Sequence, residues 1–192
     1  RVLFRSAARD GVEGPALFPT YLALREKRLG DRARPLRTAI EALLDPATVT
    51  RFFVRAPAAP MHGLLPPALD PSSSKARPRP GLPTLPAGLR LSLVFDAASE
   101  DHGAVAERLQ VKLHDLGVTV ALRRLPRAEL RSALAAGDYD LALVGFSALP
   151  EAGMALAQLV DFANGPKAAR EELRLVGVGA DPAARAALAA ER

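Results

Sequence analysis

The sequence predicts an α/β fold in which an open sheet is flanked by helices. Between residues 89 and 162, segments with the patterns of strands alternate three times with segments that have the pattern of helices. The strand segments are short and rich in Leu and Val, whereas the helix segments repeat apolar residues every three or four positions. Such a series of βα units is typical of parallel strands covered by helices.

The first unit of this series is expected at residues 89–116. A strand is predicted at 89–95, because its apolar residues fall on one face of an alternating pattern. A helix is predicted at 101–116, with Gly117 as a left-handed cap at its end. The residues that define the two apolar faces are Leu89, Leu91, Leu93 and Phe95 in the strand, and Val105, Leu109, Leu113 and Leu116 in the helix.

The next two units follow without a long gap. A second strand is predicted at 118–125, and Pro126 begins a helix over 127–136 that Gly137 ends. The third strand, 139–146, is apolar on both faces, as expected of a central parallel strand with helices on either side. Residues 154–162 again have a helical pattern.

The amino-terminal part of the chain has weaker patterns. A short strand is predicted at residues 2–4, and residues 21–29 are expected to form a strand that leads into a polar turn. Two short helices are predicted within 34–54. They meet at Asp45, a favourable N-cap, because Pro46 suits the first position of a helix.

Residues 56–88 are expected to form a long loop. This segment contains most of the prolines, a run of three serines and the basic sequence KARPRP. Proline lacks the amide donor that a helix interior or a central strand requires. The arginines of the chain are spread among acids without an aromatic pattern, so its net charge of +5 does not indicate a nucleic-acid partner.

The composition excludes several chemistries. There is no cysteine, which rules out thiol catalysis, thiolate metal sites and disulfides. No apolar run is long enough to span a bilayer, and no signal peptide is present in the 192 residues. The chain starts at Arg1 without a methionine, so we expect it to be part of a longer protein.

No enzyme site, cofactor or metal centre is predicted. The three histidines lie in different predicted segments without ligand spacing, at positions 62, 102 and 114. Ser147 lacks both the following glycine of a nucleophile elbow and a partner histidine. Residues 176–181, VGVGAD, lack the third glycine of a dinucleotide-binding loop. Asp138 and Asp140 are better explained as turn residues, with Asp138 accepting from backbone amides after the helix, than as an acid–base pair.

Five segments, in this order, resemble extracytoplasmic solute-binding proteins of the peptide/nickel type, family 5, the receptors of ABC importers. The segments are YLALRE, RPLRTAIEALLDPATVTRFF, GLLPP, the strand–helix–strand of residues 89–125, and GDYDLALVGF. Arg37, Ala39 and Asp45 match residues typical of the family, whereas Arg25 replaces its usual asparagine. The resemblance extends from about Tyr21 to Gln158.

The resemblance implies a periplasmic-binding-protein type II-like lobe, the C-terminal one of two. Residues 1–20 would then be a remnant or connector from the first lobe, residues 21–165 the lobe itself, and residues 166–192 the start of the return segment. A small solute or peptide would bind between the lobes of a monomer outside the cytoplasm, and the closed form would engage the importer's membrane subunits. The alternative is a sensor or regulatory domain that retains the fold without transport.

The resemblance also implies ligand contacts at the end of the third strand. These would be Gly145, Phe146, Ser147 and Glu151. Phe146 stands where the family has tryptophan, so it keeps an apolar face but lacks the indole donor. Leu149 stands where peptide-binding members place the aspartate that pairs with the ligand's ammonium group. Glu151 is the candidate substitute for that aspartate.

Overall fold

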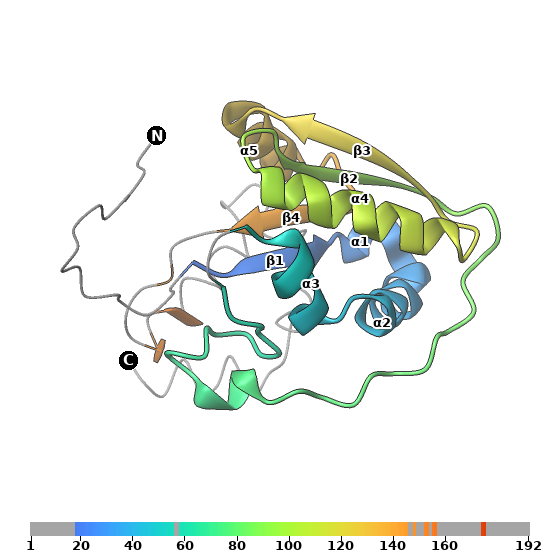
Figure 1. Cartoon of the computed structure of the whole chain (residues 1–192). Helices are drawn as coiled ribbons and strands as arrows, with labels where there is room; N and C mark the ends of the chain where they lie inside the picture. Colours follow the sequence, from blue (N-terminus) through green and yellow to red (C-terminus); the bar gives the residue numbers. More distant parts are fainter. Residues whose placement is uncertain are drawn as a thin grey trace.

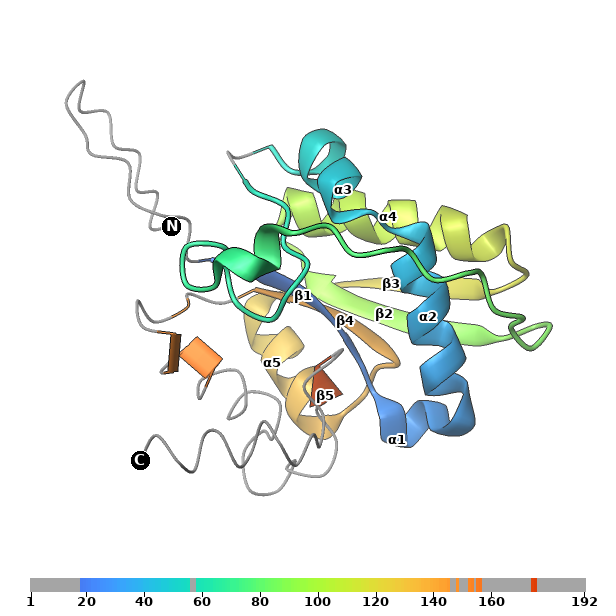
Figure 2. The ribbon, with the colours of Figure 1, turned by 90° about the horizontal axis from the view of Figure 1, so that it is seen from below.

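The fold is built around one mixed sheet. The computed structural model describes residues 18–55, 58–145, 148, 152–153 and 155–156, and the backbone of 174–175. The strands lie in the order β3-β2-β4-β1-β5; the first four are labelled in Figure 1 and β5 in Figure 2. Their bounds are β1 Thr20–Leu24, β2 Arg90–Asp96, β3 Thr119–Leu125, β4 Leu141–Gly145 and β5 Arg174–Leu175.

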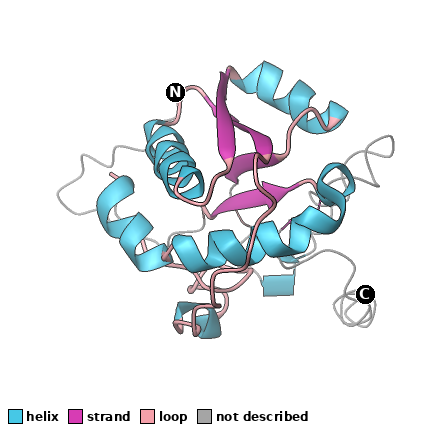
Figure 3. Ribbon diagram, turned by 90° about the vertical axis from the view of Figure 1, so that its right-hand side faces the viewer, coloured by secondary structure: helices cyan, strands magenta, loops and turns pink. Residues whose placement is uncertain are grey.

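The sheet is flanked by helices (Figure 3), and the structure gives the bounds of five α-helices and two short 3-10 helices. The α-helices are α1 Glu26–Leu29, α2 Ala33–Leu43, α3 Pro46–Phe53, α4 Glu100–His114 and α5 Arg127–Ala136; the 3-10 helices are η1 Gly30–Arg32 and η2 Pro71–Ser74. None of the described helices has both the length and the apolar character needed to cross a membrane.

The sheet has two parallel pairings and two antiparallel ones. β2 runs parallel to both β3 and β4, as the βα series predicts, with Leu93 opposite Leu141. β1 runs antiparallel to β4, and β5 antiparallel to β1. The expectation that β4 is a central strand is confirmed, but it has one parallel and one antiparallel neighbour, so the sheet is mixed.

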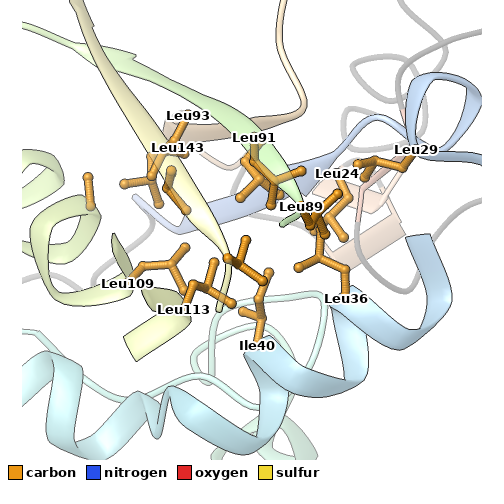
Figure 4. Close-up of a cluster of buried hydrophobic side chains, with 14 of the residues drawn as sticks. Leu24, Leu29, Leu36, Ile40, Leu89, Leu91, Leu93, Leu109, Leu113 and Leu143 are labelled. Atoms are coloured by element: carbon orange, nitrogen blue, oxygen red, sulfur yellow. The ribbon is translucent and has the colours of Figure 1, made fainter. Parts of the chain in front are cut away.

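The two crossover helices lie on opposite faces of the sheet (Figure 2). α4 joins β2 to β3 and packs on the first face, together with α2. The core on this face includes the side chains labelled in Figure 4, which come from β1, β2, β4, α1, α2 and α4, and from Leu89 just before β2. Its fully buried members include Leu36, Leu93, Phe95, Leu109 and Leu113.

α5 joins β3 to β4 and packs on the second face. There Leu130 of α5 contacts a smaller core whose buried members include Val94, Tyr139 and Val144. Both faces of β4 are therefore covered, and its first four residues are all buried. This burial explains the unbroken apolar pattern of the strand.

Most predicted element ends agree with the structure. The Asp45 side chain accepts a hydrogen bond from the Thr48 amide at 3.1 Å, and Pro46 is the first residue of α3. Gly117 and Gly137 both have the predicted left-handed backbone, with φ of 76° and 66°. α4 starts one residue and ends two residues before the predicted helix 101–116, and the Ser99 hydroxyl caps its first turn by accepting from the His102 amide.

The structure changes some of the other expectations and leaves some aside. The polar turn after β1 is the short helix α1. The predicted strand at residues 2–4 and the segment 176–181 both lie outside the described residues. Of the predicted helix 154–162, only residues 155 and 156 are described, and both are helical. The loop at 56–88 is confirmed where it is described, except for the one turn of η2.

Candidate ligand-binding edge of the sheet

The topology singles out one edge of the sheet. From β2 the chain passes through α4 to β3, and then returns through α5 to β4 on the other side of β2. The carboxyl ends of β2 and β4 are therefore neighbours, at the point where the strand order changes direction. In open α/β sheets, ligands bind outside the carboxyl ends of strands at such a switch point. We take the strand ends at Asp96 and Gly145 as the candidate site.

Gly145 is covered by an aromatic ring from the start of β1. It pairs with Thr20 across the antiparallel ladder. A Cβ added at Gly145 would lie 2.9 Å from Cε1 of Phe18 and 3.4 Å from Oγ1 of Thr20. The Phe18 side chain is itself 62% exposed. No sequence pattern indicates Phe18, because its place depends on the antiparallel pairing of β1 with β4.

The turn GLLPP, residues 63–67, lies against the second face near the same edge. The Tyr21 hydroxyl donates a hydrogen bond of 2.6 Å to the carbonyl of Leu64, and Leu64 and Leu65 pack on the second core. Burial raises the pKa of the Tyr21 hydroxyl well above its usual range. At Gly63 an added Cβ would lie 2.6 Å from Cβ of Ser73, so only glycine fits there. These contacts fix the turn to β1.

The end of β2 carries polar groups. Oδ1 of Asp96 accepts from the Ala98 amide at 2.9 Å, and the Ser99 hydroxyl accepts from the His102 amide at 3.2 Å. His102 is half-buried in the first turn of α4. Its Nδ1 is buried and makes no hydrogen bond within the part of the chain that the structure describes. Burial lowers the pKa of His102, and the charges of Asp96 and Asp101 partly oppose this.

The lowered pKa of His102 predicts a loss of stability in mild acid. The folded protein keeps His102 neutral to a lower pH than the unfolded chain, whose histidines titrate near 6.5. The stabilisation is thus complete above pH 6.5 and declines as the pH falls toward the folded pKa. Urea unfolding between pH 7.5 and 5.5 should show a smaller pH dependence for His102→Asn than for the wild type. Parallel curves would contradict this account of His102.

The two acids of the predicted turn lie at the opposite end of β4 from Gly145. Asp140 is buried, and its Oδ2 accepts from the amide of Ser92 at 2.7 Å and from its hydroxyl at 3.1 Å. Oδ1 of Asp140 is 2.9 Å from Nε of Arg28. Asp140 therefore connects β4 to β2 and to α1.

The expectation that the Asp138 carboxylate accepts from backbone amides is wrong. It lies 2.8 Å from an Arg123 nitrogen and 3.5 Å from one of Arg28. The hydrogen bond and charge of Arg123 hold the pKa of Asp138 below its usual value. Arginines that are distant in sequence replace the local amides as partners, and no turn pattern could have identified them.

Of the four predicted ligand-contact residues, only Gly145 lies within the described part of the chain. Phe146, Ser147 and Glu151 lie outside it, as does Leu149. Ala148, between them, is buried. No group of three or more described His, Asp or Glu side chains is arranged to hold a metal ion.

No protein-family model matches the chain, and no curated protein sequence matches it. Many solved structures do resemble it, at low sequence identity. The DppA periplasmic binding protein of Helicobacter pylori, in complex with the peptide STSA, is 16% identical with a TM-score of 0.65. That match covers 81% of this chain and 32% of DppA.

Two further structures extend the comparison. OppA of Haemophilus influenzae, in complex with RPPGFSPFR, is 17% identical with a TM-score of 0.59, over 75% of this chain and 32% of OppA. The substrate-binding protein CtaP of Listeria monocytogenes is 18% identical with a TM-score of 0.61, over 93% of this chain and 41% of CtaP. The chain spans less than half the length of each of these proteins. The described part of the chain thus has the fold of a lobe of the peptide-binding proteins of ABC transporters.

Proposed function

We propose that this chain is part of the solute-binding component of an ABC importer and binds a peptide or a related small solute. The observation that most supports this function is the candidate edge, where the carboxyl ends of β2 and β4 meet in a fold shared with peptide-binding proteins. At this edge the largely exposed ring of Phe18 lies beside Gly145, at the end of β4. This arrangement suits contact with a ligand rather than a covalent reaction.

The site supports binding without catalysis. His102, in the first turn of α4, has a buried Nδ1 that makes no hydrogen bond to another described group, so it is not paired with a nucleophile there. The acids Asp138 and Asp140 are held by arginines at the other end of β4. In this proposal residues 21–165 form the C-terminal lobe, and residues 1–20 and 166–192 connect it to a first lobe.

The proposal includes the setting in which such proteins act. The solute would be captured outside the cytoplasm, in the cleft between this lobe and the first one. A monomer closed on its solute would then engage the importer's membrane subunits, with Gly145, Phe146, Ser147 and Glu151 as the ligand contacts of this lobe. Hinge closure of two lobes around a ligand is a common mechanism of this kind.

A thermal-shift screen of the full-length protein tests the proposal. Peptides, sugars and metal chelates are added separately, and peptides are expected to raise the melting temperature. A ligand at a hundred times its Kd stabilises the folded state by about 2.7 kcal/mol. The absence of a shift with every solute, or the hydrolysis of an added peptide, would refute the proposal. Stabilisation without any transport defect in a deletion strain would instead favour a sensor.

A further inference from the structure

We propose that Phe18 forms an apolar specificity subsite at the end of β4 and receives an aromatic or large aliphatic group of the solute. This inference rests on the proposed function. Phe18 is not one of the ligand contacts predicted from the sequence. It precedes β1, whereas the predicted contacts lie at the end of β4 and after it. Its ring is positioned by Gly145, whose missing side chain leaves room for it.

The first argument is the exposure of the ring. Phe18 is one of four large hydrophobic side chains that are strongly exposed among the described residues, with 62% of its surface accessible. The ring atoms nearest to a Cβ built on Gly145 are Cε1 and Cζ, at 2.9 and 3.5 Å. Burying the remaining face against a ligand would remove apolar surface from water, which is favourable by about 25 cal/mol per Å².

The second argument is the place of the ring in the fold. Thr20 is opposite Gly145, so Phe18 lies just beyond the carboxyl end of β4. This end borders the switch point between β4 and β2, where an open α/β sheet binds its ligand. An exposed aromatic ring at this position is therefore beside the expected solute.

The third argument is the chemistry around the ring. Residues 18–21 and 141–145 contain no charged side chain. The nearby turn contributes Leu64 and Leu65, which pack with Tyr21. The acids of the edge belong to the β2 side, at Asp96 and Asp101. An uncharged, apolar group of the solute thus matches the β1–β4 half of the edge.

A purely structural role for Phe18 makes a different prediction. Aromatic side chains can stabilise a sheet by covering a glycine on a neighbouring strand. In that case the loss of Phe18 would lower the melting temperature but leave the preference among ligands unchanged. Selectivity between ligands therefore separates the two roles, whereas stability alone does not.

The experiment measures peptide binding by calorimetry with the full-length protein. The probes are trialanine and three tripeptides in which one alanine is replaced by phenylalanine. The wild type should bind at least one phenylalanine peptide about 3- to 10-fold more tightly than trialanine, as expected of an aromatic pair. Phe18→Ala should abolish this preference, so that its Kd values for the phenylalanine peptides approach its Kd for trialanine.

Two further variants make the outcome specific. Phe52→Ala is the matched control, because Phe52 is also a phenylalanine and 66% exposed, but lies on α3 beside Arg51. It should retain the preference. Gly145→Ala should reduce the preference, because the new methyl group would displace the ring.

A preference that survives in Phe18→Ala would overturn the inference but not the function. Failure of the wild type to bind any of the four peptides would overturn the inference together with the peptide part of the proposed function.

Discussion

Asp140→Ala is expected to lower the free energy of unfolding by about 2–4 kcal/mol. The substitution removes the acceptor of two hydrogen bonds from Ser92 and leaves their donors unpaired near the middle of the sheet. It also removes the partner of Arg28, although that side chain is 45% exposed and can regain water. Urea denaturation of the wild type and the variant at pH 7 measures the difference.

Asp138→Ala is the matched control for this prediction. Asp138 also pairs with Arg28 and lies only two residues away, but its side chain is 57% exposed. Exposed ion pairs contribute little to stability, so this variant should be much less affected. Equal effects of the two substitutions would show that burial and the bonds to Ser92 do not distinguish Asp140.

Leu93→Ala is expected to cost about 2–5 kcal/mol, as is typical of a truncated core leucine. Leu93 is fully buried on β2 and belongs to the larger core, which joins the sheet to α2 and α4 (Figure 4). Its removal leaves a cavity that the surrounding strands can fill only in part. The measurement is again the free energy of unfolding in urea.

Leu82→Ala provides the control with the same chemical change. Leu82 lies in the Pro-rich segment and is 57% exposed. Its substitution should change stability by no more than about 0.5 kcal/mol, as for most surface positions. A Leu93→Ala variant as stable as Leu82→Ala would contradict the assignment of β2 to the centre of the core.

The repeating part of the fold could be predicted because local patterns determine it. In β2 the alternation of Leu89, Leu91 and Leu93 matches the buried face, and in α4 Leu109 and Leu113 lie on the predicted stripe. Gly137 ends α5 because only glycine readily adopts its left-handed backbone. Each of these features depends on residues close together in the sequence.

The pairing of β1 could not be predicted in the same way. Its short apolar sequence fits a parallel or an antiparallel neighbour equally well, and the partner, β4, is far away in the sequence. The contact of Phe18 with Gly145 and the pairing of Arg28 with Asp138 and Asp140 all follow from that arrangement. From the sequence, the candidate site could therefore be predicted only at β4. The contribution of β1 to the site depends on the pairing of β1 with β4 in the folded structure.

Calorimetric titration of the full-length protein with short peptides tests the central claim most directly. We expect saturable binding of one peptide per protein molecule, with the peptide recovered intact afterwards. Binding should also raise the melting temperature in proportion to the logarithm of the peptide concentration above Kd. The absence of saturable binding to any peptide, or recovery of cleaved peptide, would contradict the claim that the chain belongs to a peptide-binding component of an importer.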